Sequence, residues 1–339
     1  MLKILLRVNE ISPVHVGEHM ELKNTPWIPA EVWVIQSKEL LAGGLANAIA
    51  SSLLNPFDVV KVRLQTQPLG APIYRNFATA LQSIAQQEGI FRKWGGLWFP
   101  GLPASILREM GYSSFRFGLY PLIRDFYSSF HDSKQSSLLI KVFAGLTTGG
   151  LGSAMANPTD LIKIRFQSEA GLLGVDGRYE TGLHKGQFPT YSSTRRAFVE
   201  IWRQEGIAGL YRGAIPTMSR AGVLAAAQLS SYDHSKSWLK SQGLFGEGVR
   251  LHVTCSVISA FLTACASQPF DTVKSRYMAD ISKNYAGPIE CAIKIFRTEG
   301  LTGFYRGWIP SFLRFAPHFT IAFPLWEQIR HLFGLGFFK

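Results

Sequence analysis

The sequence predicts an all-α membrane protein: six transmembrane helices in three pseudo-threefold repeats, with a short surface helix in each repeat. Three observations carry this prediction. One motif occurs three times, an apolar stretch precedes each copy, and each repeat has an arginine at the same place in its second half. We consider the repeat first, because a missed repeat leads to a wrong fold.

The composition fits this class and excludes others. Of the 339 residues, 47% are hydrophobic and 17% are charged, where an average soluble chain has about 25% charged residues. Lys and Arg number 35 against 23 Asp and Glu, which gives a formal charge of +12. That charge indicates anionic partners. Because the matched arginines lie inside apolar spans and not on one exposed patch, we expect no nucleic-acid partner.

The sequence lacks the marks of a metal-dependent or cofactor-dependent enzyme. Its three cysteines, Cys255, Cys265 and Cys291, form no C-x-x-C pair, which argues against a zinc site and against a disulfide framework. No nucleophile motif and no nucleotide-binding loop is present. We therefore expect no enzyme, no cofactor and no metal.

The repeated motif has the form P-x-D-x-x-K-x-R. Its copies occupy residues 56–63, 158–165 and 269–276, so they recur after 102 and 111 residues. A single copy would be weak evidence, but three copies at near-equal intervals are strong evidence.

The first span of each repeat is the apolar stretch before the motif. Residues 40–55 carry no charge, 138–157 carry only Lys141, and 251–270 carry only the titratable His252. With the motif attached, each stretch approaches the roughly 20 residues that cross a bilayer as a helix.

The second half of each repeat contains an amphipathic segment that ends in Glu-Gly, at Glu88, Glu205 and Glu299. These segments predict surface helices stopped by glycine. A further helical pattern then runs to about residue 128, 240 or 333. The predicted units are an extension over 1–36 and repeats over 37–130, 131–242 and 243–339.

Arg108, Arg220 and Arg314 each lie seven residues after the glycine that opens a second span. An arginine in hydrocarbon costs about 2.5 to 3.5 kcal/mol on insertion scales, so such residues normally face a polar interior. Threefold symmetry would bring the three together as a ring, and guanidinium groups pair bidentately with carboxylates. The ring predicts a site for an anion with at least two acidic groups. Snorkelling to headgroups fits Arg63 and Arg124 better, since they lie near span ends.

Side chains on the same helical faces extend this candidate site. Steps of four residues lead to Tyr112 and Arg116 in repeat 1, Gln228 in repeat 2 and His318 in repeat 3. Tyr112 and Gln228 are equally compatible with contacts between helices, and His318 with a core histidine beside Pro317. His318 titrates near neutral pH, which leaves a proton-coupling role open.

The motifs also predict a gate. Pro56, Pro158 and Pro269 are expected to bend three helix ends toward the axis. Each motif Asp and Lys share one helical face. At the axis they could form three pairs between repeats that close one side of a pore: Asp58 with Lys163, Asp160 with Lys274, and Asp271 with Lys61.

A second set of charged residues follows an aromatic residue near the far end of each second span. These residues are Asp233 and Lys236 in repeat 2, Glu327 and Arg330 in repeat 3, and Arg124 in repeat 1, where Pro121 replaces the acid. This gate could pair Asp233 with Arg330 and Glu327 with Arg124, which leaves Lys236 without a partner. Two gates around a central site are the ingredients of alternating access.

The triple motif resembles that of the mitochondrial carrier family, along nearly all of residues 37 to 333. The resemblance implies an inner-membrane solute carrier with a matrix gate at the P-x-D-x-x-K motifs and a cytoplasmic gate at the aromatic-acid-x-x-base motifs. It implies that Gln65 and Gln167 brace the matrix gate, where the third repeat has Met278 instead. It also implies cardiolipin at helix ends that offer backbone donors to phosphate. The positions are Tyr211, Arg212, Gly213, Tyr305, Arg306 and Gly307.

Within the family, the residues around the three arginines are similar to the dicarboxylate, oxoglutarate and uncoupling-protein branch. Pro317-His318 and Gln228-Leu229 look more like the dicarboxylate and oxoglutarate carriers. Uncoupling proteins tend to place an acid five residues before the first motif proline, where this chain has Ser51. Further departures are Glu109, where the dicarboxylate branch favours glutamine, about five extra residues at 92–96, and a long glycine-rich loop over 169–190.

We therefore expect a monomeric, multi-pass inner-membrane carrier that exchanges malate, 2-oxoglutarate, succinate or oxaloacetate. The second hypothesis is an uncoupling-type proton carrier, against which Ser51 counts, or a carrier of sulfate or phosphate. The third is a carrier fold kept as a non-transporting structural subunit, which Pro121 and the extension favour and the complete motifs oppose. The extension is expected to remain uncleaved, because its three glutamates depart from the acid-poor pattern of transit peptides. It could bind a partner protein.

Overall fold

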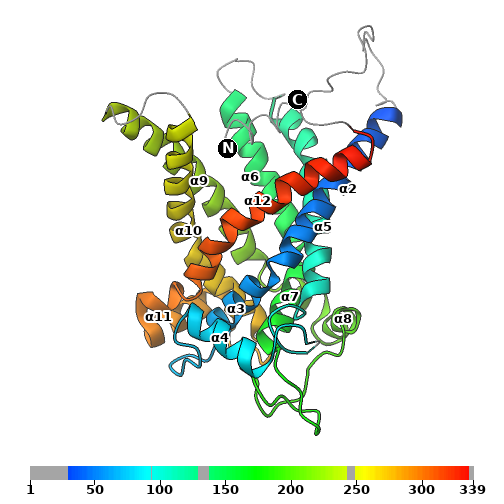
Figure 1. The fold of residues 1–339 in the computed structure, drawn as a ribbon, viewed down its shortest axis with the longest axis vertical. Helices are drawn as coiled ribbons and strands as arrows, with labels where there is room; N and C mark the ends of the chain where they lie inside the picture. Colours follow the sequence, from blue (N-terminus) through cyan, green and yellow to red (C-terminus); the bar gives the residue numbers. More distant parts are fainter. Residues whose placement is uncertain (1–29, 93, 129–136, 243–248, 336–339) are drawn as a thin grey trace.

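The computed structural model describes residues 30–92, 94–128, 137–242 and 249–335, which are mainly helical. Six long helices pack in a closed ring, each against the next. Figure 1 shows these helices from the side. In ring order they are α2 (Ala30–Leu53), α5 (Leu102–Ser128), α6 (Ser137–Met155), α9 (Ala214–Ser241), α10 (Val249–Ala279) and α12 (Trp308–Leu332). Helix α2 begins at Ala30, so residues 30–36 of the predicted extension continue directly into the first helix.

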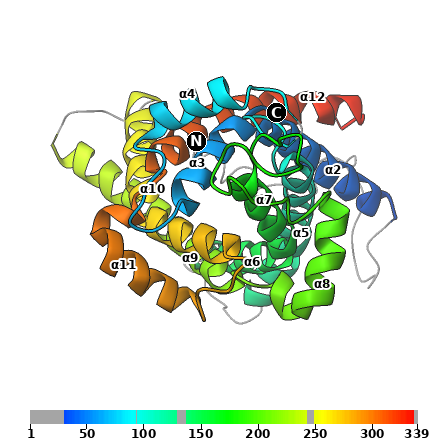
Figure 2. The ribbon, with the colours of Figure 1, turned by 90° about the horizontal axis from the view of Figure 1, so that it is seen from below.

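The three motifs meet at one end of the ring, which we call the motif end. They lie on α3 (Asn55–Thr66), on α7 (Asn157–Glu169) and on the last turns of α10. These three segments pack against one another, and Figure 2 shows them around the centre of the molecule.

The motif prolines do not act alike. The chain breaks before Pro56, where α2 and α3 meet at a bend of 65°, and it breaks again before Pro158. Pro269, in contrast, lies inside the continuous helix α10. Asparagine precedes the first two prolines, whereas Gln268 precedes the third. Glutamine is the better helix former, which favours the continuous helix.

Surface helices surround the motif end. They are α4 (Phe77–Gln87), α8 (Thr194–Leu210) and α11 (Pro288–Phe304), and each packs on the motif helix of its own repeat (Figure 2). The Glu-Gly glycines, Gly89, Gly206 and Gly300, have φ values of 83°, 68° and 64°. This left-handed conformation favours glycine and ends the helix. In α8 and α11 the chain resumes a helical turn after the glycine.

The two insertions of the sequence pack against each other. The backbone N–H of Gly171 donates to the carbonyl of Trp94 at 3.1 Å. A Cβ atom added to Gly95 would lie 2.8 Å from the carbonyl carbon and oxygen of Gly171. Tyr179 is buried, and Leu183 packs on a cluster of repeat 1. This contact between residues 94–97 and 170–190, which we call the clasp, joins repeats 1 and 2.

The bundle exposes apolar side chains and buries charged ones. Leu41, Phe143 and Val257 are 49%, 53% and 58% exposed, whereas Arg63 and Arg165 are fully buried. No single helix of the described residues meets a length-and-hydropathy criterion for a membrane span, while the bent pair of residues 37–53 and 55–66 meets it jointly.

Candidate functional site

Three ion pairs join the repeats at the motif end. The Asp–Lys pairs expected from the sequence are all present: Lys163 Nζ lies 2.6 Å from Asp58 Oδ2, Lys274 Nζ lies 2.5 Å from Asp160 Oδ2, and Lys61 Nζ lies 2.9 Å from Asp271 Oδ2. The three aspartates are buried. The pairs are positioned by the mutual packing of α3, α7 and α10.

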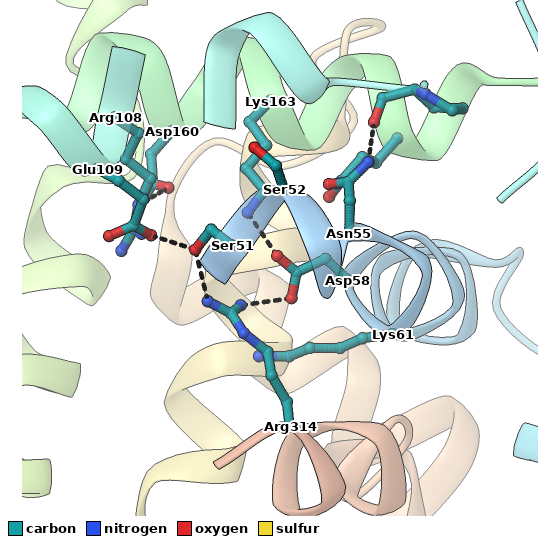
Figure 3. A network of polar contacts seen from close by, with 12 residues as sticks. Ser51, Ser52, Asn55, Asp58, Lys61, Arg108, Glu109, Asp160, Lys163 and Arg314 are labelled. Carbon is teal, nitrogen blue, oxygen red and sulfur yellow. Dashed lines mark hydrogen bonds and ion pairs between the residues drawn. The ribbon is translucent and has the colours of Figure 1, made fainter. Parts of the chain in front are cut away.

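The three arginines of the predicted ring lie against the same aspartates. Arg108 Nε is 2.6 Å from Asp160 Oδ1, Arg314 pairs with Asp58, and Arg220 pairs with Asp271. Figure 3 shows the first two contacts. Each aspartate thus holds a lysine from the next repeat and an arginine from the previous one.

Site and gate are therefore one assembly in this structure, where the sequence suggested a ring of arginines and a separate gate. We call these nine residues the charge network: Asp58, Asp160, Asp271, Lys61, Lys163, Lys274, Arg108, Arg220 and Arg314. The physical reason is that charges buried away from water require opposite charges close by.

Tyr112 and His318 lie close to arginines of the predicted ring and remain predicted site residues. The guanidinium carbon of Arg108 lies 5.8 Å from the centre of the Tyr112 ring, a cation–π distance. His318 is half-buried on α12, within electrostatic reach of Arg314 and Glu109.

Gln228 lies at the contact between α9 and α10. Its carbonyl oxygen accepts a hydrogen bond from Ser259 Oγ at 2.9 Å, which links α9 to α10, and its side chain is half-buried. The side chain of Arg116, the fourth predicted arginine, lies outside the part that the structure describes. Both remain predicted site residues.

Glu109 is a site residue that the sequence reasoning missed. It follows Arg108 on α5 and is 6% exposed. Its Oε1 accepts a hydrogen bond from Ser51 Oγ at 3.1 Å and pairs with Arg108 Nη1. Arg314 Nη2 donates to the same Ser51 hydroxyl at 3.4 Å (Figure 3). The available signal was an acid beside an arginine within an apolar span.

A second set of ion pairs was also missed. The arginine that ends each motif binds the glutamate of the Glu-Gly pair in its own repeat; we call these the anchor pairs. They are Arg63–Glu88 at 2.6 Å, Arg165–Glu205 at 2.8 Å and Arg276–Glu299 at 2.9 Å. The expectation that Arg63 snorkels is wrong, because its side chain is fully buried against Glu88. Both partners recur in every repeat, which was the available signal.

The glutamines beside the motifs bond to neighbouring repeats. Gln65 Oε1 accepts from Ser275 Oγ at 2.8 Å, and Gln167 Nε2 donates to Asn55 Oδ1 at 3.0 Å. These bonds go to neutral side chains and not to the aspartates of the charge network. Met278, the third counterpart, is fully buried in an apolar cluster.

The opposite end of the ring contains an ion pair that was not predicted. Arg330 Nη2 lies 2.9 Å from Glu39 Oε1. The side chains of Asp233 and Pro121 lie outside the described part, so the Asp233–Arg330 pair remains a prediction.

The other expected pair at that end is not formed. Among the described side chains, Glu327 and Arg124 make no ion pair with each other.

The side chains at the predicted lipid positions differ in exposure and pairing. Tyr211 and Tyr305 are 43% and 46% exposed, and the glycines that follow, at 213 and 307, have left-handed φ values. Arg212 is instead buried, with Nη2 2.9 Å from Asp280 Oδ2, and Arg306 Nε lies 3.2 Å from Glu299. Asp280 thus holds the Arg212 side chain inside, and the lipid positions remain a prediction.

Comparison with known proteins gives a consistent result. The family described as mitochondrial carrier protein matches residues 34–131, 134–243 and 247–336. The chain is 34% identical to the mouse mitochondrial 2-oxoglutarate/malate carrier protein over 87% of this chain and 90% of that one. It is 32% identical to a probable 2-oxoglutarate/malate carrier of Dictyostelium discoideum (93% and 95% covered) and 32% identical to mitochondrial uncoupling protein 5 of Arabidopsis thaliana (87% and 97%).

Proposed function

The chain belongs to the mitochondrial carrier family, and from this we propose that it is a multi-pass inner-membrane protein that exchanges small dicarboxylates of the malate, 2-oxoglutarate, succinate or oxaloacetate class. Members of this family are transporters and not enzymes. The apolar exterior and charged interior of the helix ring support six spans in a bilayer.

One observation carries the substrate class. Each of Arg108, Arg220 and Arg314 already holds a carboxylate, supplied by a motif aspartate of another repeat. These carboxylates are the same chemical group as those of a dicarboxylate. A small dianion can therefore replace two aspartates at once. A monocarboxylate can replace only one.

Exchange then follows from competition for the arginines. Substrate enters between the helices from the end opposite the motifs, and its carboxylates replace aspartates at two arginines. Each displaced aspartate retains its lysine but loses half of its ion pairing, which weakens the closure between repeats. Only binding that is stronger in the opening state than in the closed state drives this step. At the far end we assign closure to Glu39 and Arg330, together with the predicted residues of that gate.

Lipid contacts belong to the same proposal. We assign cardiolipin to the helix starts at 213 and 307, where exposed tyrosines flank backbone N–H groups that can donate to phosphate. The closed ring of six helices supports a monomer as the transporting unit.

A proton-conducting or inorganic-anion carrier is the alternative. The similarity to uncoupling protein 5 of Arabidopsis thaliana, equal in identity to that with the Dictyostelium carrier, favours it. Sulfate and phosphate also present two acidic oxygens, which guanidinium groups bind.

The proposal is tested by uptake of labelled malate, 2-oxoglutarate, sulfate, phosphate and ATP into liposomes that hold the purified protein, with and without internal malate. We expect malate and 2-oxoglutarate uptake that depends on internal dicarboxylate. Replacing Arg220 with alanine removes a charged partner worth about 3 kcal/mol, so exchange should fall about 100-fold.

The matched control is Arg178→Ala, which removes an exposed loop arginine. This variant should exchange malate like the wild type. Ordinary exchange by a folded Arg220→Ala variant would refute the site. Uptake of sulfate or phosphate alone, or a proton leak without malate exchange, would favour the alternative. Failure of the wild type to move any anion would instead favour a structural subunit.

A further inference from the structure

Glu109 breaks the threefold pattern of the charge network. The residues that follow the other two arginines are Ala221 and Phe315, which carry no charge. The charge network has six cations and three carboxylates, a net charge of +3. Glu109 lowers this net charge to +2. It belongs to one repeat and has no acidic counterpart beside the other two arginines. A buried acid at such a position depends on the cations beside it, because an uncompensated buried charge is costly.

The pairing of Glu109 depends on Arg108. Its Oε1 contacts the Arg108 guanidinium and the Ser51 hydroxyl. Arg108 is shared, since its Nε also lies against Asp160. If Arg108 turns to a substrate carboxylate, Glu109 loses its ion pair and keeps only the hydrogen bond from the Ser51 hydroxyl, while Arg314 and Lys163 act on it from beyond ion-pair distance. A carboxylate that loses its cation while it is buried costs several kcal/mol, and a neutral carboxyl group avoids this cost.

We propose that Glu109 takes up a proton when substrate engages Arg108, so that each dicarboxylate crosses the membrane together with one proton. This inference rests on the proposed function. The proton comes from bulk water, forms an O–H bond with the carboxylate, and returns to water on the other side when Arg108 rebinds Glu109. Ser51 Oγ then accepts the proton's hydrogen bond, having donated in the closed state.

The groups that face Glu109 hold it as a carboxylate while Arg108 is paired with it, so the proton can bind only after Arg108 has turned away. Arg108 on its own helix, Arg314 on α12 and Lys163 on α7 stay cationic, and α2 contributes the neutral Ser51. His318 on α12 is the second titratable candidate. Arg314 and Arg108 also act on His318, and their positive charges oppose a second cation there, so we assign the proton to the carboxylate.

The test measures labelled-malate exchange against internal malate in liposomes, with the same pH on both sides, from pH 6 to pH 8. Malate stays a dianion in this range, so the pH dependence reports the protein. For the wild type we expect exchange at pH 6 to exceed that at pH 8 by about tenfold or more, because each pH unit lowers proton activity tenfold. Glu109→Gln should lose this dependence, with rates at the two pH values within about twofold.

Two control variants locate the proton. Glu39→Gln removes a carboxylate that pairs with an arginine at the other end, and His318→Asn removes the second titratable candidate. Both should keep the wild-type ratio between pH 6 and pH 8. Two results would overturn the inference. One is a wild-type exchange rate that does not change between pH 6 and pH 8. The other is a ratio of rates at pH 6 and pH 8 that is kept in Glu109→Gln and lost in His318→Asn.

The same vesicles separate two further outcomes. If labelled aspartate exchanges much faster than malate and neither depends on pH, Glu109 binds a substrate ammonium group, and the proton assignment is wrong. If folded wild-type protein exchanges no dicarboxylate at any pH, the proposed function itself fails, and the inference fails with it.

Discussion

Charged side chains are paired and buried to different extents at the two ends of the helix ring. At the motif end, every aspartate of the charge network holds two cations from two other repeats, and the anchor pairs fix the surface helices beside it. At the opposite end, Arg330 pairs with Glu39, whose side chain is 22% exposed, and the helices diverge (Figure 1). Buried charges must be matched closely, whereas charges near water need not be. The closure between repeats is therefore concentrated at the motif end.

The largest expected difference between the ends is in stability. Glu88→Gln leaves the fully buried Arg63 without its opposite charge and also weakens the acceptor of the Gly96 N–H. Breaking such a pair costs about 3 to 5 kcal/mol, which corresponds to a fall in melting temperature of about 10 °C. Glu39→Gln, the same change at the opposite end, should cost about 1 kcal/mol or less.

Both variants are measured by thermal unfolding of the purified protein followed by tryptophan fluorescence. Equal shifts for the two variants would contradict the comparison. The double change of Arg63 and Glu88 to methionine provides a further check, because it removes both charges. It should recover part of the lost stability, since methionine is apolar and of comparable length.

The sequence predicted much of what the threefold repeat determines, although the anchor pairs, which recur in every repeat, were missed. The helix ends near 128, 240 and 333 agree with the structure, and so do the three Asp–Lys pairs, because symmetry tells which repeat each motif faces. Symmetry alone did not show that the arginines turn to the same aspartates, because that depends on the depth of each side chain in the bundle. Features that break the symmetry escaped prediction. Glu109 and the clasp occur once, so no repeat indicates their partners.

The clasp gives the next largest effect, since it strengthens one side of the motif end. Gly95→Ala places a methyl group 2.8 Å from the Gly171 carbonyl, and both groups belong to backbone that cannot easily move. Overpacking of this kind costs about 1 to 3 kcal/mol. Gly287→Ala is the control, because a Cβ there meets nothing within 4 Å, and it should change stability by less than about 0.5 kcal/mol.

Unfolding in detergent measures both glycine variants. A Gly95→Ala protein as stable as Gly287→Ala would mean that the clasp does not hold repeats 1 and 2 together.

The smallest effect concerns a thiol that reports whether a surface helix stays attached. Cys291 on α11 is fully buried, and burial raises the pKa of its thiol to about 12. Because the thiolate is the reactive form, only about one molecule in 10⁴ is reactive at pH 8, and labelling by a maleimide should rise about tenfold with each pH unit. Glu299→Gln breaks the anchor pair of α11 and should speed labelling at pH 8, whereas Glu39→Gln at the opposite end should not. Mass spectrometry of the peptide that contains Cys291 measures the rate. If the wild type labels Cys291 as fast as the half-buried Cys265, α11 is not held closed at the motif end.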